Sequence, residues 1–165
     1  MSHRGLVGAL VRALQQELDA AERVHAAVTA MTGALVANDG ARVGGLCATL
    51  DATASAAPAL ERRRVTAAVA LAVEVDLPPT ATLAAVAARL GRGDERRLLA
   101  LREKILAAHA DIMAGNERNR ALLATAIEYT QVSLEAIAGV IARASAYGGG
   151  RAASEPMSLC LDHRA

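Results

Sequence analysis

The sequence has almost no aromatic side chains: two Tyr are present, and Phe and Trp are absent. Aromatic side chains bury the most area in a protein core, so their absence excludes a thick globular core. Hydrophobic residues still make up 53% of the 165 residues, and they include 41 Ala, a small residue and the strongest helix former. The composition therefore favours a thin, elongated arrangement of closely packed helices, in which Leu, Val and Ile provide the buried area.

An excess of either charge is also missing, because 18 Lys and Arg stand against 17 Asp and Glu, for a net charge of +1. This balance argues against recognition of nucleic acid or of an anionic membrane. The run Arg62-Arg63-Arg64 is short and has no aromatic neighbours, so we interpret it as a solvated helix face paired with carboxylates. The two cysteines, Cys47 and Cys160, lie far apart and form no disulfide framework or metal site, which fits a reducing cytoplasm.

Long apolar runs are scarce as well. In the first predicted helix, the longest stretch without Asp, Glu, Lys or Arg runs from Val24 to Asn38 and contains His25. It is shorter than the roughly 18 apolar residues that a membrane-spanning helix needs. The first residues lead into an amphipathic pattern rather than a signal peptide. We therefore expect a cytoplasmic protein without a transmembrane segment.

Helical periodicity dominates the first half of the chain. A helix is predicted over about residues 5–38, because its apolar positions alternate in steps of three and four, the heptad pattern of a helix packed along another. Asn38-Asp39-Gly40 ends it with turn chemistry. A second helix is predicted over about 41–75, with a kink or break at Pro58. The apolar positions are Val7, Leu10, Leu14, Ala21, Val24, Val28, Met31 and Leu35 in the first helix, and Val43, Leu46, Leu50, Leu60, Val65, Val69 and Val73 in the second.

A proline-rich linker, Leu77-Pro78-Pro79, precedes a short predicted helix over about 80–90, capped by Thr80 or Thr82. Asp94 is the predicted N-cap of the last helix, over about 94–146, which would be on the order of 80 Å long at about 1.5 Å per residue. Its seam again alternates three and four: Leu98, Leu101, Ile105, Ala108, Ile112, Asn116, Asn119, Leu123, Ile127, Thr130, Leu134, Ile137 and Ile141.

The predicted fold is therefore all-α. It is an elongated antiparallel helical hairpin or bundle of three long helices plus a short one, with coiled-coil-like packing. We place it in a single domain over residues 1–147, followed by a flexible C-terminal tail over 148–165.

The length of the last helix has a consequence. A hairpin of the first two helices covers about 50 Å, so a longer helix packed along it must extend past one end, leaving the hairpin around Glu128. The apolar stripe Leu134, Ile137, Val140 and Ile141 would then lack an internal partner, which usually marks an interface. Two alternatives are that the helix bends and that its end pairs with a second copy in a dimer.

Glu17 occupies a seam position where Leu or Val would be expected. In an antiparallel hairpin with its turn at Asp39, residues near position 61 lie opposite Glu17, so we predict an ion pair with Arg62 or Arg63. Pro58 leaves a register error of several residues in this prediction. Such a pair would serve register more than stability.

The chain offers little for catalysis, metal binding or cofactors. Glu22-x-x-His25 has the spacing used in di-iron bundles, but no second copy exists, and a helix-surface histidine is the simpler interpretation. His109 could suggest a phosphotransfer histidine, yet the following residues do not supply the expected Lys and Gly. Gly148-Gly149-Gly150 follows a helix and cannot present a helix N-terminus to a phosphate. We therefore predict a protein that is not an enzyme and binds no cofactor or metal.

Two asparagines three residues apart, Asn116 and Asn119, lie on the seam of the last helix, followed by Leu122 and Leu123. An asparagine on an apolar seam costs stability and usually fixes register or partner. We interpret this feature as a polar notch, flanked by leucines and Ile127, that another chain recognises. The alternative is a solvated turn near Gly115.

These residues are where the sequence resembles the FlgN family of flagellar type III export chaperones. The resemblance is carried by Asn116, Asn119, Leu122 and Leu123, then by an amphipathic helix and Tyr147-Gly148-Gly149-Gly150, which is similar to a short Tyr-Gly motif past the last helix of the family. The Leu77-Pro78-Pro79 linker before Thr82-Leu83 fits too, as do Leu14 and Glu17. The resemblance covers about residues 5–151, and order and spacing carry it. The high Ala content and Pro58 depart from the family pattern.

The resemblance implies a cytoplasmic chaperone that escorts hook-associated proteins of the FlgK and FlgL type, its clients, and delivers them to the flagellar export gate. It implies that the chaperone holds a helical terminal segment of the client, which suits a helix-in-groove mode. Tyr147 is by resemblance the candidate contact to the export apparatus. The predicted client-binding residues are Asn116, Asn119, Leu122, Leu123, Ile127, Leu134, Ile137, Val140 and Ile141.

Two other functional classes remain open on the sequence alone. One is a coiled-coil structural or adaptor protein that self-associates, as a homodimer or higher oligomer, through the last helix. The other is a four-helix signalling domain, in which His109 would be needed.

Overall fold

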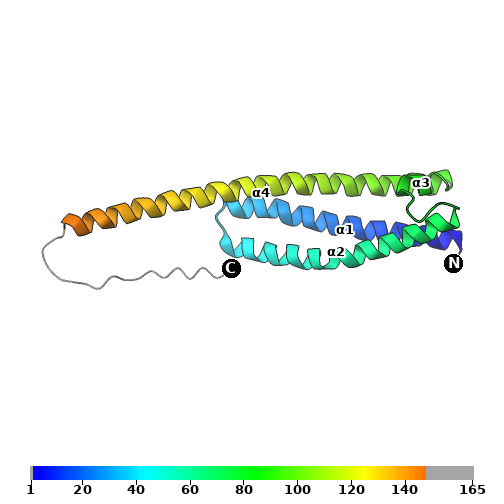
Figure 1. Cartoon of the computed structure of the whole chain (residues 1–165), viewed down its shortest axis with the longest axis horizontal. Coiled ribbons are helices and arrows are strands. Elements are labelled where there is room, and N and C mark those ends of the chain that lie inside the picture. Colours follow the sequence, from blue (N-terminus) through cyan, green and yellow to red (C-terminus); the bar gives the residue numbers. More distant parts are fainter. Residues whose placement is uncertain (1, 148–165) are drawn as a thin grey trace. The chain divides into compact units, whose positions relative to one another are not determined.

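A computed structural model describes residues 2–147, with side chains up to Ser145, as four helices. They are α1 (His3–Val36), α2 (Gly40–Glu74), α3 (Leu83–Ala87) and α4 (Arg92–Tyr147) (Figure 1). The all-α prediction of three long helices and a short one is confirmed. The tail predicted over 148–165 lies outside the described residues.

The chain divides into two units, Met1–Ala124 and Thr125–Ala165. The first unit holds α1, α2, α3 and the part of α4 up to Ala124. The second contains, among the described residues, the remainder of α4 over 125–147, which we call the terminal segment. The division falls inside the single domain predicted over 1–147, and each unit is described by itself.

The turn between α1 and α2 forms as its residue types require. Asn38 takes a positive φ of 53°, a conformation that asparagine tolerates better than most residues. Asp39 is the N-cap of α2, and its carboxylate accepts a hydrogen bond of 3.0 Å from the Arg42 backbone N–H. The chain therefore reverses here, and α1 and α2 run antiparallel within the first unit (Figure 1).

Helix α2 continues from Gly40 to Glu74 with Pro58 inside it, so the chain does not break there. Figure 1 shows that α2 changes direction along its length, as a helix with an interior proline does. None of the apolar positions predicted for this helix is buried, and Leu71 and Ala72 are its buried residues instead. Of the seven predicted positions, five are half-buried and two, Val65 and Val73, are exposed, so the predicted seam of α2 is only partly covered.

The start of α4 differs from the prediction. The helix begins at Arg92, and Asp94 lies with Glu95 in its first turn instead of capping it. Carboxylates in the first turn are favourable there because they face the positive end of the helix dipole. Of the two predicted caps, Thr80 and Thr82, it is Thr82 that caps α3, since its side chain accepts a hydrogen bond of 3.2 Å from the Ala85 N–H.

The main core lies at the end of the first unit where α1 begins, α2 ends, and α3 and α4 begin. Leu10, Leu71 and Leu98 are fully buried there, one from each long helix. Val86 and Ala87 of α3 are buried in the same cluster, so the short helix closes this end. The opposite half of the first unit relies on α1, where Val28, Met31 and Ala34 are buried.

Candidate functional site

The terminal segment exposes a row of large apolar side chains. Leu134 is 60% exposed and Ile137 56%, and both lie on the seam predicted from the sequence. Of the large hydrophobic residues that are exposed among those described, most fall between Leu123 and the end of this segment: Leu123, Ile127, Tyr129, Val132, Leu134, Ile137, Val140 and Ile141. We call Ile127, Leu134, Ile137, Val140 and Ile141 the terminal stripe. Proteins rarely expose large contiguous apolar surfaces, so such a row is a candidate contact for another chain.

A groove of about 420 Å³ lies in the first unit between α2 and α4, with α1 as its floor. The floor includes two small side chains, Ala20 and Ala21, which leave room above α1. The walls carry larger apolar groups, such as Leu50 on α2 and Ile112 on α4. The remaining lining residues are Glu17, Val24, Val28, Thr53, Ala54, Ala57, Leu60, His109 and Asn116.

The two predicted notch asparagines have different surroundings. Asn116 is exposed and lines the groove. Asn119 is only 6% exposed, and its amide is already occupied within the first unit. Its Nδ2 donates a 3.0 Å hydrogen bond to the Val28 carbonyl of α1, and its Oδ1 accepts a 2.7 Å hydrogen bond from the Thr32 hydroxyl. The structure therefore gives Asn116 and Asn119 separate positions, one open and one internal.

Two contacts beside Asn119 were not anticipated from the sequence. Thr32 was not singled out, because its position opposite Asn119 depends on how α1 and α4 align. Gly115 is buried, and a Cβ atom there would lie 2.6 Å from Val28 Cγ1, so the two helices approach closely at this point. The one available signal was Gly115 itself, a glycine inside a helix one turn before Asn119.

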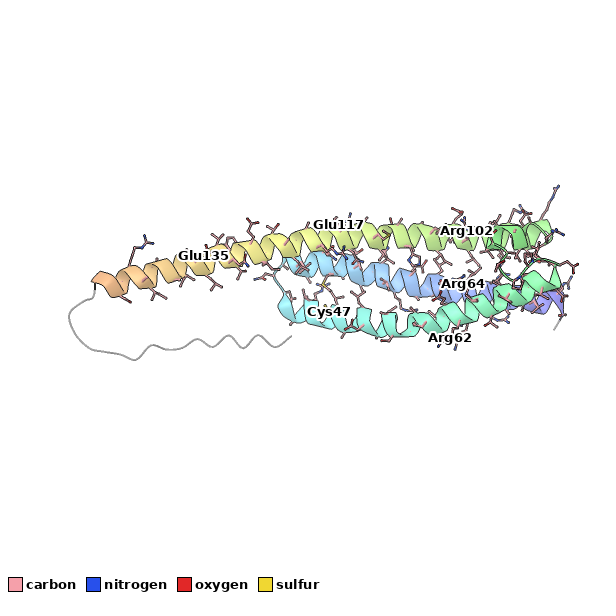
Figure 2. All side chains as sticks on the ribbon, in the orientation of Figure 1. Cys47, Arg62, Arg64, Arg102, Glu117 and Glu135 are labelled. Carbon is pink, nitrogen blue, oxygen red and sulfur yellow. The ribbon has the colours of Figure 1, made fainter. Side chains whose placement is uncertain are left out.

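The predicted ion pair of Glu17 forms with Arg64, not with Arg62 or Arg63. Arg64 Nε, on α2, lies 2.9 Å from Glu17 Oε2, on α1. Figure 2 labels Arg64 where α1 and α2 run side by side. The contact is ionic and not a well-aligned hydrogen bond, because Glu17 Oε2 has no hydrogen-bond partner. Arg63 instead reaches Gln16 Oε1 at 3.5 Å, so the register of the hairpin is within two residues of the prediction.

The remaining predicted site residues have mixed surroundings. Leu122 is half-buried and Leu123 is 44% exposed, both in the first unit. Tyr147, the predicted export-gate contact, is the last residue of α4, and its side chain lies outside the described residues. His109 is exposed beside the groove, and Cys47 is an exposed free thiol.

Within residues 2–147, none of the helices is long and apolar enough to span a membrane. In the same part of the chain, no three His, Cys, Asp or Glu side chains gather where they could hold a metal ion. The prominent surface features of the described residues are an apolar groove and an apolar helix face.

Comparison with known proteins finds a match to a family model. The family model described as FlgN protein matches residues 1–155, which covers most of the chain. No curated protein and no solved structure matches. The match includes all four helices and every residue that carries the resemblance seen in the sequence. The chain therefore belongs to the FlgN family of flagellar export chaperones, which are chaperones and not enzymes.

Proposed function

We propose that this chaperone binds hook-associated proteins of the FlgK and FlgL type in the cytoplasm and delivers them to the flagellar export gate. The observation that carries the proposal is the exposed terminal stripe, in which Leu134, Ile137 and Ile141 recur at heptad spacing. A helical client segment with an apolar face can pack along such a stripe, burying both surfaces.

The client-binding surface in this proposal has two parts. One is the terminal stripe of the second unit. The other is the stretch of the first unit near the groove, with Asn116, Leu122 and Leu123. The apolar stripe supplies affinity through buried area, and the exposed amide of Asn116 supplies selectivity, because a partner that leaves it unpaired loses a hydrogen bond. Asn119 was also predicted to belong to this surface, but both polar atoms of its side chain are hydrogen-bonded to α1.

Release is as important as binding for an export chaperone. A client segment that is disordered before it binds loses conformational entropy when it folds on the chaperone, which keeps the affinity moderate. By family resemblance, Tyr147 at the end of α4 is the contact to the export apparatus. The client surface and the gate contact would then lie on the same helix.

A charge placed on the terminal stripe tests this proposal. Leu134→Asp or Ile137→Asp should abolish binding of a hook-associated protein, because a carboxylate would be buried without a partner. Ala142→Asp is the matched control: it puts the same charge in the same segment, on an exposed residue that has no member of the terminal stripe three or four positions away. It should bind the client nearly as the unchanged protein does. Binding is measured by calorimetry, and helicity by circular dichroism.

Three results would count against the proposal. If the unchanged protein binds no hook-associated protein, the client assignment is wrong. If Leu134→Asp binds as well as Ala142→Asp, the stripe is not the binding surface. If light scattering shows a constant oligomer that a client does not alter, self-association through α4 is the better explanation of the stripe.

A further inference from the structure

We infer that Thr32 is a positioning residue for client binding: with the Val28 carbonyl it holds the Asn119 amide and so fixes α4 on α1 beside the client surface. The inference rests on the proposed function above, and it deepens that function by assigning roles to residues that do not touch the client. We call Asn119, Thr32 and the Val28 carbonyl the clasp.

The hydrogen-bond chemistry of the clasp allows a single arrangement. The Val28 carbonyl has no proton, so the atom of Asn119 facing it at 3.0 Å must be the amide nitrogen, Nδ2. The other amide atom is then the oxygen, which has no proton to give, so the Thr32 hydroxyl must donate to it across 2.7 Å. That hydroxyl has one proton, which leaves its 3.4 Å contact with the Val28 carbonyl without a donor in this arrangement.

Burial makes this arrangement demanding. Among the described residues, Asn119 is the one polar side chain that is buried, with 6% of its surface exposed. A buried amide that loses one partner is destabilising, because water does not reach it to replace the lost hydrogen bond. The amide therefore tolerates one rotation of α4 and one axial position of it relative to Val28 and Thr32. A seam made only of Leu and Ile would tolerate small slips of the helix.

Gly115 makes the position tighter still. A Cβ atom at Gly115 would lie 2.6 Å from Val28 Cγ1, and Val28 is 1% exposed and β-branched, so it has little room to move. Gly115 and Asn119 lie one turn apart on the same face of α4, and both contact α1 at Val28. Together they fix the depth and the register of α4 at this point.

The residues fixed in this way border the client surface. Asn116 lies between Gly115 and Asn119 in the sequence and lines the groove, while Leu122 and Leu123 follow within the same unit. With Asn119 held inward on α1, Asn116 is held on the groove wall. The clasp therefore acts through Asn116 and its neighbours, and its own polar atoms are not free to recognise a client.

The test removes the Thr32 hydroxyl, which donates to Asn119 Oδ1. Thr32→Val keeps the branched shape, so the protein should fold, but it leaves Asn119 Oδ1 buried without a donor. Thr32→Ser restores the donor. Thr29→Val is the matched control on the same helix, where Thr29 is exposed. Amide hydrogen exchange of the full chain is measured over Asn116–Ala124, and affinity for a hook-associated protein is measured by calorimetry.

We expect Thr32→Val to speed exchange over Asn116–Ala124 and to weaken client affinity, each by about tenfold, the scale set by one unsatisfied buried group. Exchange around Leu98 should stay unchanged, and Thr32→Ser should recover both properties. Unchanged exchange in Thr32→Val would show that the clasp does not hold α4 on α1. Faster exchange with full client affinity would overturn its positioning role. If the unchanged protein binds no client, the proposed function and the positioning role fail together, whereas the exchange result still decides whether the clasp holds α4.

Discussion

Helix α1 and the terminal segment of α4 carry the same kind of apolar seam, with opposite outcomes. Leu10, Leu14 and Val28 of α1 are at most 3% exposed, whereas Leu134, Ile137 and Ile141 are 56 to 60% exposed. The seam spacing is the same in both. Heptad periodicity therefore indicates that a helix has a face to bury, and it does not indicate whether the covering surface belongs to the same chain.

The residues around the two seams differ in size. The α1 seam is flanked by buried alanines, including Ala13, Ala20 and Ala27, which allow neighbouring helices to approach from several sides. The terminal stripe consists of Ile, Leu and Val, larger side chains that fill space between helices only when a partner offers holes for them. This difference agrees with an internal role for α1 and an external one for the terminal segment.

Truncating one leucine in each region gives the largest expected contrast. Leu10→Ala should lower the free energy of unfolding by about 2–5 kcal/mol, because Leu10 is fully buried and the loss leaves a cavity. Leu134→Ala should change it by less than about 0.5 kcal/mol without a client, because that side chain is already in water. Urea unfolding followed by circular dichroism measures both. An equally large loss in Leu134→Ala would mean that a partner, such as a second copy, already covers the stripe in the free protein.

Two interior glycines of α4 allow a test with opposite signs. Gly115→Ala forces a Cβ against Val28, an overpacking cost of about 1–3 kcal/mol that exceeds the gain of about 0.5–1 kcal/mol in helix propensity. A Cβ at Gly139 would meet only Arg143 Nη2, at 3.7 Å. Gly139→Ala should therefore gain helix stability, by up to about 1 kcal/mol.

Urea unfolding reports the loss in Gly115→Ala, and amide hydrogen exchange over 125–145 reports the gain in Gly139→Ala. A neutral or stabilising Gly115→Ala would show that α1 and α4 do not depend on close approach at Val28. A destabilising Gly139→Ala would show that this face of the terminal segment is covered in the free protein. Either result would remove part of the contrast between the two regions.

The helices and their ends were largely predictable from the sequence because they depend on local chemistry. Asp39 and Thr82 cap helices through hydrogen bonds to residues three positions later, so the signal and its effect are close together. Asp94 was misplaced because a carboxylate is favourable both at the cap and in the first turn, so the residue type alone does not separate the two positions.

Features that depend on contacts distant in the sequence were less predictable. Thr32 and Asn119 are 87 residues apart, and no pattern in either helix identifies the other as its partner. The incomplete burial of the predicted seam of α2 was missed for a different reason. Alanines surround its Leu and Val positions, so several faces of this helix are nearly equally apolar, and the sequence does not single out the one that packs on α1.

Breaking the ion pair of Glu17 and Arg64 should have the smallest of the expected effects. It tests the register of α2 along α1 in the first unit. The two side chains are 24% and 35% exposed, so solvent screens the pair and its coupling energy should be at most about 1 kcal/mol. A double-mutant cycle of Glu17→Ala and Arg64→Ala, followed by urea unfolding, measures that coupling, which should shrink in high salt.

Two control cycles show whether a coupling energy this small is specific to Glu17 and Arg64. Arg120 Nη1 lies 3.8 Å from Glu117 Oε2 within α4, and both side chains are about 80% exposed. A double-mutant cycle of these two residues should therefore show almost no coupling. Glu17→Ala with Arg62→Ala should also be additive, because Arg62 is not the partner. Coupling of Glu17 to Arg62 in place of Arg64 would mean that α2 is shifted along α1. The groove floored by α1 would then have different walls from those described, whereas the exposed stripe of the terminal segment would be unaffected.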